Sequence, residues 1–225
     1  MYVNPLKQAA ELAFSGQTAV PVVKLGERVL VDSTPVCLQL DAALPENRVL
    51  PAEPALKEKC LAHDRWVTDR LIPTGFYTSQ NLPLLASLKN GWLSGRIHHV
   101  TTPGGLPLVL RLLWPLLVLR ANFVGDVIAG IDPALTVAEA RAEVANEFVE
   151  RLEGGPYLGG QGVPSLADCA AYGHFVPCWL GGMTGYSDVT ERAEIRDWVK
   201  RMTPLVYDPR PFWPAQITRR QVSNL

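Results

Sequence analysis

The sequence predicts an α+β protein that is mostly α-helical. β-branched residues form two short runs around a glycine-containing turn, residues 20–24 and 28–31, which is the pattern of a β-hairpin. Beyond residue 54, apolar residues recur at helical spacing instead. The chain has 225 residues, 48% of them hydrophobic and 19% charged, so it can bury the core of one large domain or two small ones.

The first elements are short. Pro5 stands in the first turn of an amphipathic pattern that Gly16 ends. A proline-rich crossing between residues 44 and 54 marks the boundary between one domain over residues 1–47 and a second over residues 48–225. The elements expected before this boundary are a helix over 5–14, strands over 20–24 and 28–31, and a helix from Asp32 to about Leu44.

Six helices are expected after the boundary. The pattern from Val137 is the clearest, since apolar residues recur every four positions up to Leu152, and Thr136 is expected to cap this helix together with Glu139. The tail from Pro204 is expected to be irregular. The expected helices are about Pro54–Leu71, Leu82–Asn90, Leu106–Ala129, Val137–Glu153, Leu166–Leu180 and Thr190–Met202.

The leucine-rich stretch over residues 106–128 is the most apolar of these. Charged residues such as Arg111 and Asp126 interrupt it, whereas a membrane span needs about 20 apolar residues with few or no charges. We therefore expect no stable membrane span, but a buried or interface helix kinked at Pro115. Contact with a membrane surface is the alternative.

A capping box is expected where the helix from Leu166 begins. Ser165 stands three residues before Asp168, so each side chain can bond the backbone of the other and satisfy free amides at the helix start. The helix that follows is apolar nearly all round, which is typical of a central buried helix. Taken alone, Ser165 and Asp168 form a structural cap rather than a reactive site.

Two segments together resemble the glutathione transferase family. One is Tyr157-Leu-Gly-Gly followed by Ser165-Leu-Ala-Asp168; the other is the hairpin that starts Val20-Pro-Val-Val and ends at Asp32-Ser33. They occur in the order that the family has. The resemblance implies that residues 1–47 are a partial thioredoxin-like unit, and that an all-helical C-terminal domain of the glutathione transferase type follows it.

The resemblance also implies a site for glutathione as co-substrate. Val20 would pair through its backbone with the cysteinyl part, and a cis bond to Pro21 would hold that shape. Ser33 would bind the γ-glutamyl carboxylate at the helix N-terminus, while Asp32 would take the ammonium group or shape the turn. Judged by spacing alone, Ser33 is only a helix cap, and Val20 and Pro21 are only a strand entry.

The residue that would activate the thiol is unknown. In the family a strand, a helix and a second strand come before this hairpin and carry a catalytic Tyr, Ser or Cys. Here the residues before Val20 indicate a single helix, and both Tyr2 and Ser15 are poorly placed. We expect a truncated family member. Three alternatives are open: the sequence begins inside a longer chain, another chain covers the hairpin, or the helical domain packs over it.

The function implied by the resemblance is glutathione-dependent transfer to an electrophilic small molecule by a homodimer. Trp66, Tyr77 and Trp92 would line the co-substrate pocket, although core packing is the better explanation of such aromatic residues. Two alternatives remain: a non-catalytic binding or assembly module built on the same scaffold, and a lipid-substrate isomerase at a membrane surface.

The remaining composition disfavours several other classes. With 21 basic and 22 acidic residues, nothing favours nucleic acid. The N-terminus lacks the pattern of a secretory signal, and the four cysteines are widely spaced, so we expect a cytoplasmic protein with buried free thiols. No metal site is expected, since His98 and His99 lack a third ligand. We expect His63 and Asp64 on a solvated helix face, and His174 in the core.

Overall fold

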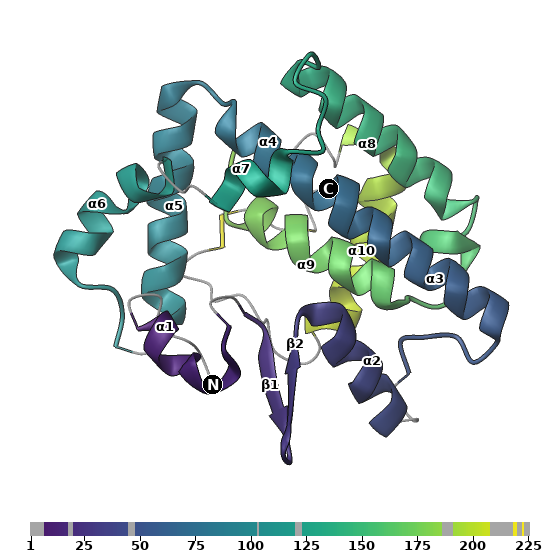
Figure 1. The fold of residues 1–225 in the computed structure, drawn as a ribbon. Coiled ribbons are helices and arrows are strands. Elements are labelled where there is room, and N and C mark those ends of the chain that lie inside the picture. Colours follow the sequence, from purple (N-terminus) through teal and green to yellow (C-terminus); the bar gives the residue numbers. More distant parts are fainter. Residues whose placement is uncertain are drawn as a thin grey trace.

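The computed structural model describes residues 7–17, 20–44, 48–102, 104–119, 123–185, 191–207, 218–219 and 222. Within these residues the protein is mostly helical and has a single two-stranded antiparallel sheet (Figure 1). The predicted class, α+β and mostly α, is confirmed at this level.

The N-terminal unit is a hairpin between two short helical segments. The strands pair antiparallel, with Val22 opposite Val31, around a turn at Gly26, which has a positive φ of 60°. Pro5, in the first predicted helix, lies outside the described residues; that helix is a short turn of α-helix followed by a 3₁₀ turn, Ala13–Ser15. The elements are α1 (Gln8–Glu11), β1 (Val22–Leu25), β2 (Arg28–Val31) and α2 (Ser33–Ala43).

Eight α-helices lie in the rest of the described chain, with a 3₁₀ turn at Leu158–Gly160. A five-residue π-helical segment, Val67–Leu71, joins the first two of them into one bent rod. They are α3 (Pro54–Trp66), α4 (Ile72–Gln80), α5 (Leu84–Thr101), α6 (Leu108–Leu119), α7 (Phe123–Ile128), α8 (Val137–Leu152), α9 (Leu166–Leu180) and α10 (Ala193–Tyr207).

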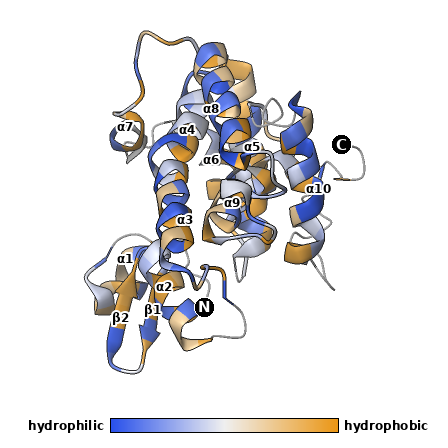
Figure 2. Ribbon diagram, turned by 90° about the vertical axis from the view of Figure 1, so that its right-hand side faces the viewer, coloured by the Kyte–Doolittle hydropathy of each residue, from blue (hydrophilic) through white to orange (hydrophobic). Residues whose placement is uncertain are grey.

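The core is built around α9, which lies between α3 and α10 (Figure 2). Ala167, Ala171 and Val176 of α9 are completely buried, and Phe148 of α8 packs edge-on against Trp198 of α10, with 5.0 Å between ring centroids. The structure confirms that this helix is central and buried. Small residues along α9 allow the neighbouring helices to approach it closely.

A smaller apolar cluster joins the N-terminal unit to the helices. Leu50, Cys60 and Leu166 form it, and Cys37 of α2 packs against it. The connection before α3 is fixed by Asp41, whose carboxylate accepts hydrogen bonds from the amides of Val49 and Leu50 at 2.7 and 3.1 Å. Val49 and Leu50, in the second half of the proline-rich crossing, therefore contact both parts.

Helix α5 runs 11 residues beyond its predicted end at Asn90. The glycine after Asn90 resembles a stop signal, but Gly91 serves a close helix contact instead: a Cβ atom there would lie 2.6 Å from the Cα of Pro115. Gly95 meets the side chain of Trp114 in the same way. The two helices form an antiparallel hairpin at one edge of the molecule (Figure 1), with Pro115 inside α6.

The range predicted as one helix over 106–129 holds two described helices, α6 and α7, and residues 120–122 between them lie outside the described residues. One face of α6 is exposed, so the buried alternative does not hold, while an interface helix stays a prediction. Two other expectations about burial were wrong. Of the four free cysteines only Cys60 is buried, while Cys169 is exposed. His63 and Asp64, expected on a solvated face, are both buried. Among the described residues, no helix is both long enough and apolar enough to cross a bilayer.

Candidate functional site

The open end of the hairpin brings four predicted residues together. Val22 pairs with Val31. The Val20–Pro21 peptide, which leads into β1, is cis, and Val20 is 57% exposed. Asp32 and Ser33 follow β2 directly, so both pairs of residues flank the same end of the two-stranded sheet.

Asp32 has an unusual backbone conformation. Its φ of 71° and ψ of 150° lie in a region that is almost restricted to glycine. Its carboxylate oxygen Oδ1 accepts the Ser33 amide at 2.6 Å and faces the Ser33 hydroxyl at 3.4 Å. A non-glycine residue held in such a conformation costs about 1–3 kcal/mol, and such residues cluster at ligand clamps and active sites.

The start of α2 is therefore already partly satisfied by the protein itself. The resemblance implies an amide at Ser33 that is open to a ligand, but in the structure the Asp32 carboxylate accepts this amide. Pro35 contributes no amide to this first turn. An anionic ligand would have to replace the exposed Asp32 carboxylate at Ser33, which is an exchange of one carboxylate for another on the same two donors.

A buried carboxyl group lies directly behind this turn. Asp64 of α3 is 4% exposed, and its Oδ2 accepts a hydrogen bond from the Thr34 hydroxyl at 2.8 Å. Burial raises the pKa of Asp64, and the nearby Asp32 raises it further. The sequence does carry a signal for this burial, since Cys60, Asp64 and Val67 fall on one helical stripe.

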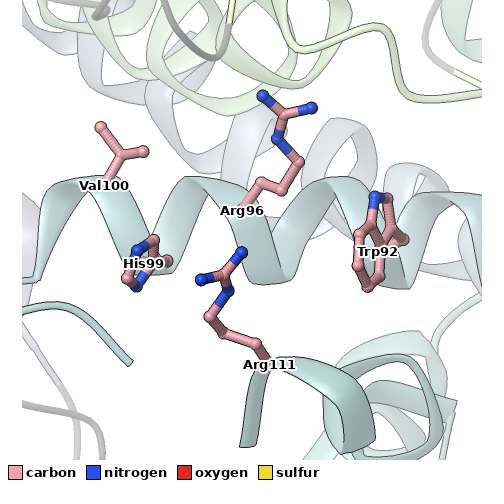
Figure 3. Close-up of a pocket in the computed structure, with 5 residues that line it drawn as sticks. All are labelled: Trp92, Arg96, His99, Val100 and Arg111. Atoms are coloured by element: carbon pink, nitrogen blue, oxygen red, sulfur yellow. The ribbon is translucent and has the colours of Figure 1, made fainter. Parts of the chain in front are cut away.

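The three aromatic residues predicted to share a pocket have different surroundings. The Trp66 ring is buried, and its indole N–H donates to Glu147; the Tyr77 hydroxyl donates to the Leu135 carbonyl at 2.7 Å. Trp92 lines a cavity of about 240 Å³ against α5 with Arg96, His99, Val100 and Arg111 (Figure 3). Neither of the two cavities described in the structure is lined by all three aromatic side chains.

The capping box at α9 is part of a larger buried arrangement. The Asp168 carboxylate is completely buried and accepts four hydrogen bonds, from the amides of Leu158 and Ser165, the Ser165 hydroxyl and the Trp198 indole, at 2.8–3.0 Å. This group links a loop, the start of α9 and the side of α10. All its contacts are internal, so its role is structural.

The histidines are not arranged for metal binding. His99 accepts the Leu106 amide through Nδ1 at 2.9 Å, while the His98 ring packs on Trp114. His63 lies between Arg151 and Glu153, and burial followed by the Arg151 charge lowers its pKa. Within the described ranges, no group of three His, Cys, Asp or Glu side chains could hold a metal ion.

The two N-terminal hydroxyl residues weighed in the sequence analysis, Ser15 and Tyr2, gain no catalytic role from the structure. Ser15 donates its hydroxyl to the Leu12 carbonyl at 2.7 Å and accepts the Gln17 amide at 3.2 Å, so it terminates the first helical segment. Tyr2 lies outside the described residues.

A comparison with models of known protein families finds none that matches this chain, and a comparison with curated proteins finds no similar sequence.

Proposed function

We propose that the protein binds glutathione at the open end of the β1–β2 hairpin and belongs functionally with the glutathione transferases, its N-terminal unit being a partial thioredoxin-like fold. The observation that carries the proposal is the glycine-like backbone of Asp32 at the start of α2, at the same end of the sheet as Val20 and Pro21. Strain of this kind is expected where a turn has been shaped for a ligand.

Each residue has a distinct role in this proposal. The backbone of Val20, held by Pro21, pairs with the cysteinyl peptide as an added strand. The Ser33 amide and hydroxyl bind the γ-glutamyl carboxylate, which the dipole of the 11-residue helix α2 favours. Once displaced from Ser33, the Asp32 carboxylate is free to accept the α-ammonium group of the same γ-glutamyl residue.

The reaction would be an attack by the glutathione sulfur on an electrophilic small molecule. The thiol loses its proton, a carbon–sulfur bond forms and the leaving group departs with the displaced electron pair. We propose that the active form is a homodimer, as the resemblance implies. A substrate pocket shared by Trp66, Tyr77 and Trp92 is not supported, because they have separate partners.

A non-catalytic glutathione-binding module is the second candidate. It is favoured because both hydroxyl groups described at this end of the molecule already face carboxylates of the protein itself. Thr34 already donates to the buried Asp64, and Ser33 faces Asp32. Neither is therefore poised to lower the pKa of a bound thiol.

Retention on immobilised glutathione tests the shared binding site. The wild-type chain should be retained and eluted by free glutathione, whereas Ser33→Ala should pass through. Thr136→Ala is the matched control, because it removes a helix-cap hydroxyl far from the hairpin and should be retained. Failure of the wild type to bind would refute both candidates. Conversion of a nitroaryl halide by the retained protein would separate the enzyme from the module.

A further inference from the structure

Helix α6 presents an apolar face to the outside of the molecule. Six of its side chains are 44–66% exposed. Their spacing places them on one half of the helix, opposite the side that packs on α5 through Trp114 and Pro115. A surface helix normally has the reverse arrangement, with charged residues facing outward. The exposed residues are Leu108, Val109, Leu112, Leu113, Leu116 and Leu117.

The charge of this region is equally one-sided. Residues 84–119, which hold both helices of the hairpin, contain three Lys and Arg residues, Lys89, Arg96 and Arg111, and no acidic residue. Leu85, Lys89, Trp92 and Arg96 follow one stripe along α5, and three of them are exposed: Leu85, Lys89 and Trp92. Basic groups and exposed apolar groups thus share the same helical hairpin.

The cavity on this hairpin shows how the two kinds of group meet. Arg111 extends from α6 toward Arg96 and His99 of α5 (Figure 3). Trp92 lies farther along α5, on the other side of Arg96 from His99. Leu108 lies one turn before Arg111, so the exposed leucines border the cavity on α6. An anionic head group in this cavity would have its apolar chains beside the leucine face.

We propose that the α5–α6 hairpin docks on an anionic lipid bilayer. The leucine face of α6 enters the boundary between head groups and acyl chains, and Lys89, Arg96 and Arg111 meet lipid phosphates. A second copy of the chain fits this surface less well, because a two-fold contact would bring basic groups toward basic groups. The hairpin lies on the membrane and does not cross it, since α6 has only 12 residues.

The close contact between Gly91 and Pro115 supports this role. The backbones meet there without intervening side chains, so the two helices can move as one rigid unit. A rigid unit loses little conformational entropy when it docks. The inference does not depend on the glutathione site, which lies at the hairpin of β1 and β2.

Co-sedimentation with vesicles tests the proposal. One set of vesicles is phosphatidylcholine alone, and the other contains one quarter phosphatidylglycerol. The wild type should sediment with the anionic set and at least tenfold less with the neutral set. Leu112→Glu/Leu116→Glu should lower the partition coefficient for the anionic set at least tenfold. The matched control is Val163→Glu/Leu205→Glu, which alters two exposed apolar residues outside the hairpin and should bind like the wild type.

A second variant tests the charge. Lys89→Gln/Arg111→Gln should weaken anionic binding by about fivefold for each charge removed and leave neutral binding unchanged. The proposal is overturned if the wild type stays in the supernatant, or if the Leu112→Glu/Leu116→Glu protein, folded by circular dichroism, sediments like the wild type. Sedimentation velocity without lipid tests whether the leucine face binds a second copy of the chain instead. A wild-type dimer that Leu112→Glu/Leu116→Glu dissociates would assign the face to that second copy and overturn the proposal.

Discussion

Replacing Asp168 with alanine should be among the most damaging single substitutions in the chain. The change leaves three buried N–H donors without their acceptor, on Leu158, Ser165 and Trp198. Each buried donor left unsatisfied costs about 1–3 kcal/mol, so the expected loss in the free energy of unfolding is roughly 3–9 kcal/mol. That range overlaps the whole stability of a typical domain, about 5–15 kcal/mol.

Urea unfolding followed by tryptophan fluorescence measures this loss. Should Asp168→Ala fail to fold, Asp168→Asn retains one acceptor oxygen and should lose a smaller, measurable part of the stability. The control is Glu139→Ala, which removes the acid of the exposed capping box at Thr136 and should cost only about 0.5–2 kcal/mol. An Asp168→Ala loss no larger than that of Glu139→Ala would refute the claim that burial of the carboxylate organises the core.

Three further predictions concern other parts of the molecule. Asp32→Gly should be more stable than Asp32→Ala by about 1–3 kcal/mol in urea unfolding, because glycine relieves the backbone strain and alanine keeps it. Gly91→Ala should destabilise the protein by about 1–3 kcal/mol through its clash with α6, while Gly173→Ala, with open space around it, should be neutral or slightly stabilising. Burial lowers the pKa of His174 from 6.5 to about 4. The unfolded chain therefore binds more protons between these pH values, and the free energy of unfolding should fall from pH 7 to pH 5, less so in His174→Gln.

Local signals in the sequence predict much of the fold. The bounds of α9 match the prediction because the cap at Ser165 lies within three residues of the acid it pairs with. The hairpin is likewise encoded by a turn and two β-branched runs, and α8 by its capping box and four-residue spacing. Features of this kind depend on neighbours along the chain, which a sequence displays directly.

Features that depend on distant contacts could not be predicted in the same way. Gly91 reads as a helix end, yet it is a packing position because Pro115 lies against it. Asp64 falls on an apolar stripe of α3, but its hydrogen-bond partner is Thr34 of α2, 30 positions earlier, which no local pattern displays. The leucines of α6 predict either a buried or an interface helix, because their composition cannot tell whether another part of the protein covers them.

The candidate site was predictable only in part. The position of Ser33 at a helix start follows from its neighbours, but the backbone of Asp32 and its bond to the Ser33 amide do not. The sequence also gives no indication that Trp66 and Tyr77 have separate hydrogen-bond partners, Glu147 and the Leu135 carbonyl. Both facts require the path of the backbone in three dimensions.

Titration calorimetry with two ligands tests the central claim most directly. Glutathione carries the γ-glutamyl group that Ser33 is proposed to bind, whereas cysteinylglycine lacks it. The wild type should bind glutathione at least tenfold more tightly than cysteinylglycine, and Ser33→Ala should lose most of that preference. If the wild type binds neither ligand, or if Ser33→Ala keeps the full preference, the open end of the hairpin is not a glutathione site.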